Sequence, residues 1–225
     1  VYSSSHMEPD AATQILLDNL DGKPLADPNH FRFRAGHRSR IWEKNDIGLG
    51  LAGGFLEPLE STAIHLVQSS IARLLALFPD SSFGEAEIAH FNRETEREYV
   101  DIRDFLILHY AATEREDSEF WRYCKNLTLP DGLQEKLAMF KSSGRVFREH
   151  EELFTETSWL SVMVGQGVEP SGYHPLAASL DEAETRNRLH HIKQVIAQAV
   201  GQMPTQADFL QQQGAAISPD AKITA

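Results

Sequence analysis

The sequence predicts a mostly helical α+β fold, and three observations support this. Several long segments repeat apolar residues at helical spacing, two short segments have strand-like patterns, and hydrophobic residues make up 41% of the 225 residues. Counting glycine and omitting tyrosine gives a share of about 45%, which is typical of a globular protein. This composition excludes a disordered chain, a collagen and a coiled-coil rod.

Two short segments near the N-terminus are predicted to be strands. Residues 31–34 (Phe-Arg-Phe-Arg) alternate apolar and basic side chains, as a half-buried strand does. Residues 47–52 form an apolar run with two glycines, and each glycine would destabilise a helix by about 1 kcal/mol. A strand pair alone is marginal in water, so we expect further strands in sequence absent from this chain.

Helices account for most of the remaining sequence. Apolar residues at helical spacing, together with Pro, Gly, Ser and Thr at the ends of the runs, mark the segments. The predicted helices are residues 8–20, 63–78, 84–112, a segment through Leu133 and Phe140 that ends at Gly144, residues 181–200, and a short one starting near Pro204. Residues 214–225 are small and polar, and are predicted to be a disordered tail.

Charge and composition exclude several classes of function. The chain has 21 basic and 33 acidic residues, a net charge of −12, so it repels nucleic-acid phosphates. The single cysteine, Cys124, allows no internal disulfide and no cysteine-rich metal site. No run is apolar enough for a membrane span, and no signal peptide opens the sequence. We expect a cytoplasmic protein that binds neither nucleic acid nor membrane, and the initial valine suggests a piece of a longer protein.

The turn between the second predicted strand and the helix at residues 63–78 has features of a ligand site. Gly53 and Gly54 let the backbone approach a ligand closely. Ser61 and Thr62 are common at helix N-termini, where free N–H groups and the helix dipole favour an anion. Glu60 places a carboxylate beside them. The alternative is an ordinary turn and helix cap without a ligand.

This turn resembles a known family signature. Residues 50–66, with Glu-Pro-Leu-Glu-Ser-Thr at their centre, resemble the signature of flavin-dependent tryptophan halogenases. The resemblance continues through residues 105–110 (Phe-Leu-Ile-Leu-His-Tyr), 120–124 (Phe-Trp-Arg-Tyr-Cys) and 165–170 (Gly-Gln-Gly-Val-Glu-Pro). It extends from residue 1 to about residue 213, nearly the whole chain.

The resemblance implies the C-terminal portion of a flavin-monooxygenase-like FAD fold. Residues 1–80 would be the remnant of the FAD and substrate domain, with a short strand pair and the flavin-facing turn and helix. Residues 81–213 would be a helical subdomain on the substrate side, followed by the tail.

The same resemblance implies a reaction and roles for residues. Reduced FAD, supplied by a flavin reductase, would react with O₂ and with chloride or bromide, and the resulting hypohalous acid would halogenate tryptophan or another electron-rich aromatic. Glu60 would position the halogenating species or accept the ring proton. The implied contacts are halide on the amides of Thr62 and Ala63, flavin on Leu51, Gly53, Gly54 and Ile64, and substrate on Trp159. Core packing is the alternative for Trp159, because bulky aromatic residues dominate protein cores.

The chain also departs from the family. The family's N-terminal half carries a GxGxxG motif, a catalytic lysine and a Trp-x-Trp-x-Ile-Pro motif, and none of these occurs here. We therefore expect a C-terminal fragment whose partner is the N-terminal half of the same enzyme, and which alone neither holds FAD tightly nor halogenates. Two alternatives stay open: a flavin-dependent monooxygenase that hydroxylates, and a non-catalytic helical interaction module.

Other polar residues are predicted to be structural. His109 and Tyr110 end an apolar helix and are interpreted as core and boundary residues. Adjacent His190 and His191 point about 100° apart on a helix, so they are interpreted as surface residues and not as metal ligands. Residues 37–40 (His-Arg-Ser-Arg) are interpreted as a solvated basic loop.

Overall fold

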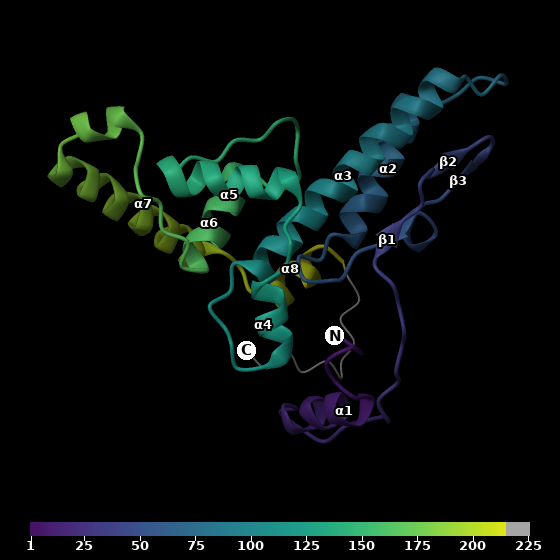
Figure 1. Ribbon diagram of the computed structural model, residues 1–225, viewed down its shortest axis with the longest axis horizontal. Coiled ribbons are helices and arrows are strands. Elements are labelled where there is room, and N and C mark those ends of the chain that lie inside the picture. The colour runs from purple at the N-terminus through teal and green to yellow at the C-terminus, as the bar shows by residue number, and fades with distance from the viewer. Residues whose placement is uncertain (215–225) are drawn as a thin grey trace. The chain divides into compact units, whose positions relative to one another are not determined.

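Two units make up the chain in the computed structural model, which describes residues 1–214 (Figure 1). The first unit is Val1–Tyr173, and the second begins at His174. This division differs from the predicted boundary at residue 80, because the helices on either side of that residue share one core. Beyond Gly214, the predicted tail lies outside the described residues.

The first unit contains the helices that the sequence predicts there, and two further ones. Their bounds are α1 (Pro9–Asp18), α2 (Ala63–Ala76), α3 (Glu85–Ala111), α4 (Glu119–Lys125), α5 (Asp131–Ser143) and α6 (Glu156–Gly165). Gly144 ends α5 as predicted, in the left-handed conformation with a φ of 64°. The expectation of a mostly helical fold with little strand is confirmed.

Four two-residue strands form two separate antiparallel pairs. The strands are β1 (Gly36–His37), β2 (Trp42–Glu43), β3 (Asp46–Ile47) and β4 (Gly54–Phe55). In the first pair Gly36 lies opposite Phe55, and in the second Trp42 lies opposite Ile47. The strands predicted at residues 31–34 and 47–52 are therefore wrong, apart from Ile47 itself.

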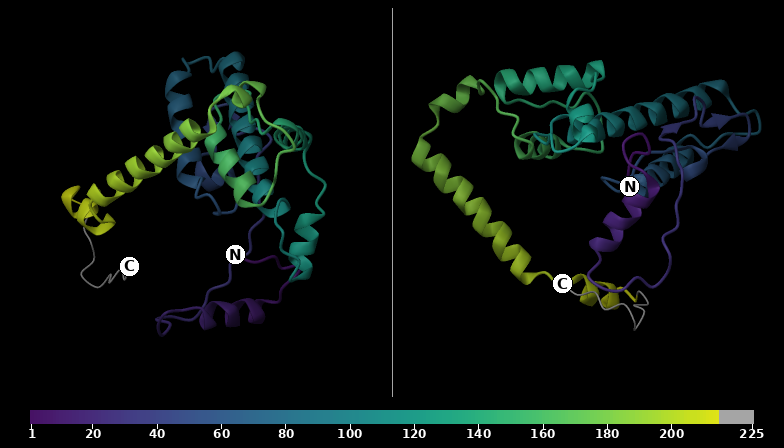
Figure 2. Two further views of the ribbon diagram at one scale, coloured as in Figure 1. Left: turned by 90° about the vertical axis from the view of Figure 1, so that its left-hand side faces the viewer. Right: turned by 60° about the horizontal axis from the view of Figure 1, so that its bottom comes forward.

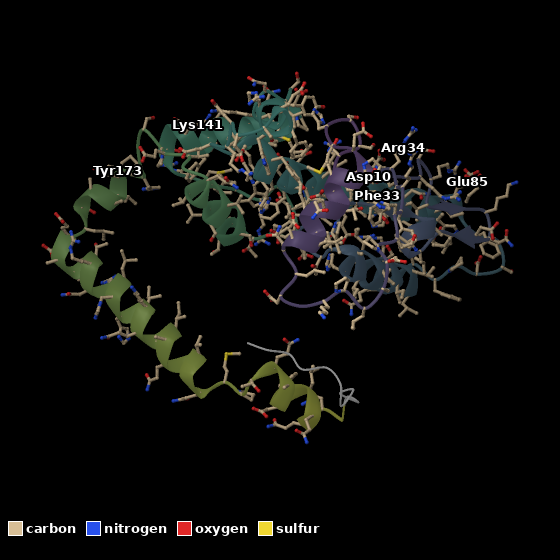
Figure 3. All side chains as sticks on the ribbon, turned by 90° about the horizontal axis from the view of Figure 1, so that it is seen from below. Asp10, Phe33, Arg34, Glu85, Lys141 and Tyr173 are labelled. Atoms are coloured by element: carbon tan, nitrogen blue, oxygen red, sulfur yellow. The ribbon has the colours of Figure 1, made fainter. Side chains whose placement is uncertain are left out.

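The reason for these errors differs between the two segments. Phe31 and Phe33 are exposed, and within the described chain no strand pairs with residues 31–34, whose end is marked by Phe33 and Arg34 in Figure 3, although the Phe33 ring contacts that of Phe55 edge-to-face at 4.9 Å. In the second segment Gly50 adopts a φ of 58°, which turns the chain into a short 3₁₀ helix, η1 (Gly50–Ala52). The glycines therefore make a turn, not a strand.

Residues of α3 from Ile88 to Leu106 form a core with α2 and the β2–β3 hairpin, and Figure 1 shows α2 beside α3. Trp42 is 1% exposed and meets Phe91 edge-to-face at 5.4 Å. Asn92 fastens the hairpin to α3. Its Oδ1 accepts the N–H groups of Ile41 and Trp42, both at 2.8 Å, and its Nδ2 donates to the Trp42 carbonyl at 2.8 Å.

The C-terminal half of α3 forms a second core with α5 and α6. Its buried members are Phe105, Leu108, Leu133, Leu137, Phe140, Trp159 and Met163. Because α3 takes part in both cores, it holds the segments before it and after it in one frame.

The second unit contains η2 (Pro175–Ser179), α7 (Glu182–Gln202) and α8 (Gln206–Gln212), and α7 is a single continuous helix in Figure 2. Asp181 caps α7 by accepting the Glu184 N–H at 2.8 Å, and Thr205 caps α8. These helices confirm the predictions at 181–200 and after Pro204. Within residues 1–214, no helix combines the length and apolar character that crossing a membrane requires.

Candidate active site

The Glu-Pro-Leu-Glu loop, residues 57–60, joins β4 to α2 and is held in a tight turn. The Ser61 N–H donates to the Pro58 carbonyl at 2.9 Å. Ser61 has a φ of 54°, a conformation that few residues other than glycine adopt. The backbone direction at Glu60 is therefore set by the turn rather than by a free loop.

The first carboxylate of this loop is anchored to α3. The Tyr110 hydroxyl donates to both oxygens of Glu57, at 2.6 and 2.7 Å. Burial, and after it the hydrogen bond to Glu57 and the Glu57 charge, raise the pKa of the Tyr110 hydroxyl well above its usual range. Tyr110 therefore stays a hydrogen-bond donor across the physiological pH range.

The second carboxylate lies against the neighbouring residue of α3. His109 Nε2 is 2.9 Å from Glu60 Oε1, and the side chains are 16% and 36% exposed. On its other side, His109 Nδ1 lies 2.8 Å from the Phe105 carbonyl oxygen, and the ring packs edge-to-face on Phe105. Among the described residues, Glu60 Oε2 has no polar partner.

The start of α2 offers free backbone N–H groups beside Glu60. Thr62 is buried and already helical, and its side chain accepts no hydrogen bond from the helix, so the predicted side-chain cap is absent. Within residues 1–214, no acceptor is paired with the N–H groups of Thr62 and Ala63. Ala63 is exposed, so this end of the helix, where the dipole is positive, is open to an anion.

The glycines of the turn are explained by contacts within the chain. A Cβ on Gly53 would lie 2.4 Å from the Gly48 carbonyl oxygen, and one on Gly54 would lie 2.7 Å from the Cβ of His37. Arg38 fastens the turn, since its Nε donates to the Ala52 carbonyl at 2.7 Å and its N–H to the Gly53 carbonyl at 2.8 Å. Gly53 itself is buried. Close packing of the chain on itself therefore requires glycine here, with or without a ligand.

Leu51 and Ile64, the predicted flavin contacts, are both exposed, at 79% and 73%. Ile64 begins a row of exposed apolar residues along α2 that we call the outer stripe of α2. Its members are Ile64, Ile71, Leu75 and Phe78, the last lying just beyond the helix end. At 100° per residue they share one face, and Leu66, which is buried in the core with α3, points away from it.

Trp159 lies in the second core and is 1% exposed. Its indole N–H donates to Glu152 at 3.2 Å, its ring meets Phe105 edge-to-face at 4.9 Å, and Lys136 lies over its face at 5.0 Å. No face of this indole is open to a substrate within the described chain. Its placement therefore supports core packing and not the predicted substrate contact.

An open cleft of about 550 Å³ adjoins His109. It is lined by His109, Thr113, Glu114, Arg115, Trp121, Val164, Gly165, Gln166 and Gly167. The Arg115 guanidinium lies 4.4 Å from the centre of the Trp121 ring, and Gln166 donates to the His109 carbonyl at 3.3 Å. In the described part of the chain, no three His, Cys, Asp or Glu side chains are grouped to hold a metal ion.

The structure thus brings Glu60, Thr62, Ala63 and Ile64 to one end of α2, and it places Trp159 elsewhere. Sequence reasoning missed His109 and Tyr110, which hold the two carboxylates of the loop. It also missed Arg38. The one available signal was that a histidine and a tyrosine stand side by side at the end of a long helix.

Solved flavin-dependent halogenases share this fold over nearly the whole chain. Xcc4156, a flavin-dependent halogenase from Xanthomonas campestris, is 44% identical with a TM-score of 0.89, over 97% of this chain and 44% of that one. BrvH, a flavin-dependent halogenase from Brevundimonas sp. BAL3, is 40% identical with a TM-score of 0.87, over 94% and 43%. The fold is therefore that of part of a flavin-dependent halogenase.

The chain belongs to the tryptophan halogenase family, whose model matches residues 1–182. Tryptophan 7-halogenase KtzQ from Kutzneria sp. (strain 744) is 34% identical over 192 residues, which are 78% of this chain and 36% of that protein. The chain spans less than half the length of the relatives it matches.

Proposed function

We propose that this chain is the C-terminal part of a cytoplasmic flavin-dependent halogenase, an oxidoreductase that halogenates tryptophan or another electron-rich aromatic. Its co-substrates are reduced FAD from a flavin reductase, O₂, and chloride or bromide. One observation carries the proposal. In a member of this family, the Glu60 carboxylate is held by His109 beside the free N–H groups at the start of α2.

In this proposal the halide binds at the helix start. The N–H groups of Thr62 and Ala63 have no acceptor among the described residues, and the helix dipole favours negative charge there. The contact is made by the backbone, so a side chain as small as that of Ala63 does not hinder it. Glu60 stands two residues before Thr62, so one short segment carries both the carboxylate and these N–H groups.

The flavin ring has a fitting surface next to this position. Leu51 on η1 and Ile64 on α2 are exposed apolar side chains. η1 packs against α2, because a Cβ on Gly50 would lie 3.4 Å from the Val67 side chain. When bound, reduced FAD would supply the two electrons that reduce O₂ to the peroxide level, and oxygen at that level oxidises the halide. The backbone at Gly53 and Gly54 would line the same side.

The outer stripe of α2 is proposed to be covered by the N-terminal half of the enzyme. The relatives are more than twice as long as this chain, and the residues of the stripe are exposed here. Four apolar side chains on one face are more than a solvated helix needs. Ile71→Lys with Leu75→Lys is expected to change the stability of this chain by less than about 0.5 kcal/mol, and to abolish its association with an N-terminal half.

A chimera tests the function. This chain replaces the matching segment of Xcc4156, to which it is 44% identical, and the purified chimera is supplied with reduced FAD, O₂, bromide and indole. Product mass is the readout. A brominated indole supports the proposal, a hydroxylated indole without bromine establishes the monooxygenase instead, and a folded chimera without turnover supports the interaction module.

The isolated chain provides a second test of the proposal. Titration with reduced or oxidised FAD is expected to show no tight stoichiometric binding, because the phosphate-binding half of the cofactor site is not in this sequence. Tight binding at one FAD per chain would contradict the division of the cofactor site between two halves.

A further inference from the structure

The start of α2 lacks a side-chain cap and is fastened to α3 through one polar contact. Thr62 stands at the N-cap position, but its side chain accepts no hydrogen bond from the helix. Within the described chain, the only side-chain hydrogen bond made by residues 61–66 is that of His65, whose Nε2 lies 2.8 Å from Oε1 of Glu98 on α3. The open N–H groups of Thr62 and Ala63 therefore stand on a helix end with a single polar anchor.

Glu98 connects three turns of α2 through one carboxylate. Besides its contact with His65, it accepts the Ser69 hydroxyl at 2.9 Å and Arg73 Nη2 at 3.1 Å, both on Oε2. His65, Ser69 and Arg73 follow one another at four-residue intervals, so they form one row along α2. The Glu98 side chain is only 13% exposed, and a carboxylate shielded from water depends on such partners.

Arg73 fixes the far end of this row. Its Nη1 donates to the hydroxyl of buried Thr95 at 2.7 Å, and that hydroxyl donates to the Phe91 carbonyl at 2.8 Å. The guanidinium also lies 5.8 Å from the centre of the Phe91 ring. Glu98 is therefore held in place from the α3 side and by Arg73, and His65 is the contact through which it reaches the first turn of α2.

We infer that Glu98 and His65 are positioning residues, which hold the first turn of α2 and with it the direction of the Thr62 and Ala63 N–H groups. That these N–H groups take the halide rests on the proposed function. Two N–H groups bind one anion well only when both point at it, so a helix start that frays loses affinity for the anion. The role is exerted through the backbone and not by contact with the halide or the arene.

Two variants form a matched pair for the test. His65→Ala and Ser69→Ala each remove one hydrogen bond to Glu98, the first in the first turn of α2 and the second one turn further on. Alanine is a better helix former than histidine or serine, so intrinsic propensity does not loosen the helix in either variant. Any difference between them therefore reports the position of the lost bond.

Hydrogen exchange tests the anchor on the 225-residue chain without cofactor. The Leu66 N–H donates to the Thr62 carbonyl at 3.0 Å, and its exchange is expected to be about 3- to 10-fold faster in His65→Ala and within twofold of the unchanged chain in Ser69→Ala. An unchanged rate in His65→Ala, or equal acceleration in both variants, overturns the inference.

Glu94→Ala is the control for a lost carboxylate on α3. Its partners Arg93 and Arg97 lie on α3 itself, so exchange of the Leu66 N–H is expected to stay at the rate of the unchanged chain. An acceleration as large as that in His65→Ala would show that any lost carboxylate of α3 loosens α2, and would also overturn the inference.

KM for bromide tests the positioning role in the halogenating chimera. His65→Ala is expected to raise it about 3- to 10-fold with KM for indole within twofold, and Ser69→Ala to leave both within twofold. His65→Gln keeps an N–H donor and is expected to recover part of the loss. Glu98→Ala is expected to raise KM for bromide as well, and adding His65→Ala to it to change nothing further, because the shared bond is already gone.

The two experiments separate this inference from the proposed function. A KM for bromide that is unchanged in His65→Ala, or that rises equally in Ser69→Ala, overturns the inference and leaves the function standing. A chimera without halogenation removes the function, and the exchange rates of the isolated chain then decide whether Glu98 and His65 hold the start of α2.

Discussion

The Tyr110 hydroxyl donates to both carboxylate oxygens of Glu57, at 2.6 and 2.7 Å, and thereby links the end of α3 to the loop before α2. The residue before Tyr110 in the chain faces the other carboxylate of that loop. Two successive side chains of one helix therefore determine how the loop presents Glu60, and the following predictions test that arrangement and the fold behind it.

The Tyr110–Glu57 contact predicts a pH dependence of stability. Unfolded tyrosine loses its proton near pH 10, whereas burial, and then Glu57, raise the pKa of Tyr110 in the folded chain. Above about pH 10 the unfolded state therefore binds fewer protons, and the free energy of unfolding falls as pH rises, by at most about 1.4 kcal/mol per pH unit. Tyr110 is partly accessible, so the observed slope is expected to lie below this limit.

Urea unfolding between pH 9 and 11 measures this slope. Tyr110→Phe is expected to be less stable than the unchanged chain at pH 8, because Glu57 loses its donor, and to show a shallower decline above pH 10. Parallel pH profiles of the two proteins would contradict the assigned role of Tyr110.

Gly53→Ala tests the close packing of the glycine turn. Its Cβ would lie 2.4 Å from the Gly48 carbonyl oxygen, so the turn must open, and we expect a loss of more than about 2 kcal/mol of unfolding free energy. Gly22→Ala is the matched control, since nothing lies within 4 Å of its Cβ, and its effect is expected to stay within about 0.5 kcal/mol. Equal stabilities for the two variants in urea would refute the packing explanation.

Asn92 tests how the β2–β3 hairpin is fastened to α3. Asn92→Ala removes the acceptor of two N–H groups and the donor to Trp42, and is expected to destabilise the chain by about 2–4 kcal/mol. Asn92→Asp keeps the acceptor and is expected to lose less. Thermal unfolding, followed by tryptophan fluorescence, compares the midpoint temperatures of the two variants with that of the unchanged chain. A lower midpoint for Asn92→Asp than for Asn92→Ala would be inconsistent with this account.

Trp159→Phe separates packing from substrate contact. It removes the N–H that Glu152 accepts, leaves space in the second core, and is expected to destabilise the chain by about 1–3 kcal/mol. In the chimera, KM for indole is expected to be unchanged at temperatures where the variant is folded. If KM for indole rose while thermal stability stayed the same, Trp159 would have to be a substrate contact and not only a core residue.

The helices were predictable because their apolar residues recur over many turns and their ends carry clear signals, as at Pro79 after α2 and Gly144 after α5. The strands were not. Alternation at residues 31–34 predicts a strand only where another strand pairs with it, and in the described chain β4 pairs with Gly36–His37 and not with residues 31–34. Glycines at positions 48 and 50 are equally compatible with a turn and with a weak strand. The packing of the backbone determines which of the two structures forms.

The site was predictable only in its local part. Glu60, Thr62 and Ala63 are neighbours in sequence, so the helix start and its carboxylate follow from a few residues. His109 reaches Glu60 only once α3 has packed across the loop, and a residue pattern along one segment contains no information about that contact. Trp159 shows the converse, since an aromatic residue near a turn is equally suited to a core and to a binding site until its burial is known.

The bromination rate of the chimera with Glu60→Gln tests the central claim most directly. Gln keeps the size of the side chain and removes its ability to accept a proton, so kcat for indole bromination is expected to fall at least about 100-fold, with flavin affinity within twofold of the unchanged chimera. Bromination at the unchanged rate would show that the carboxylate beside His109 takes no part in the chemistry.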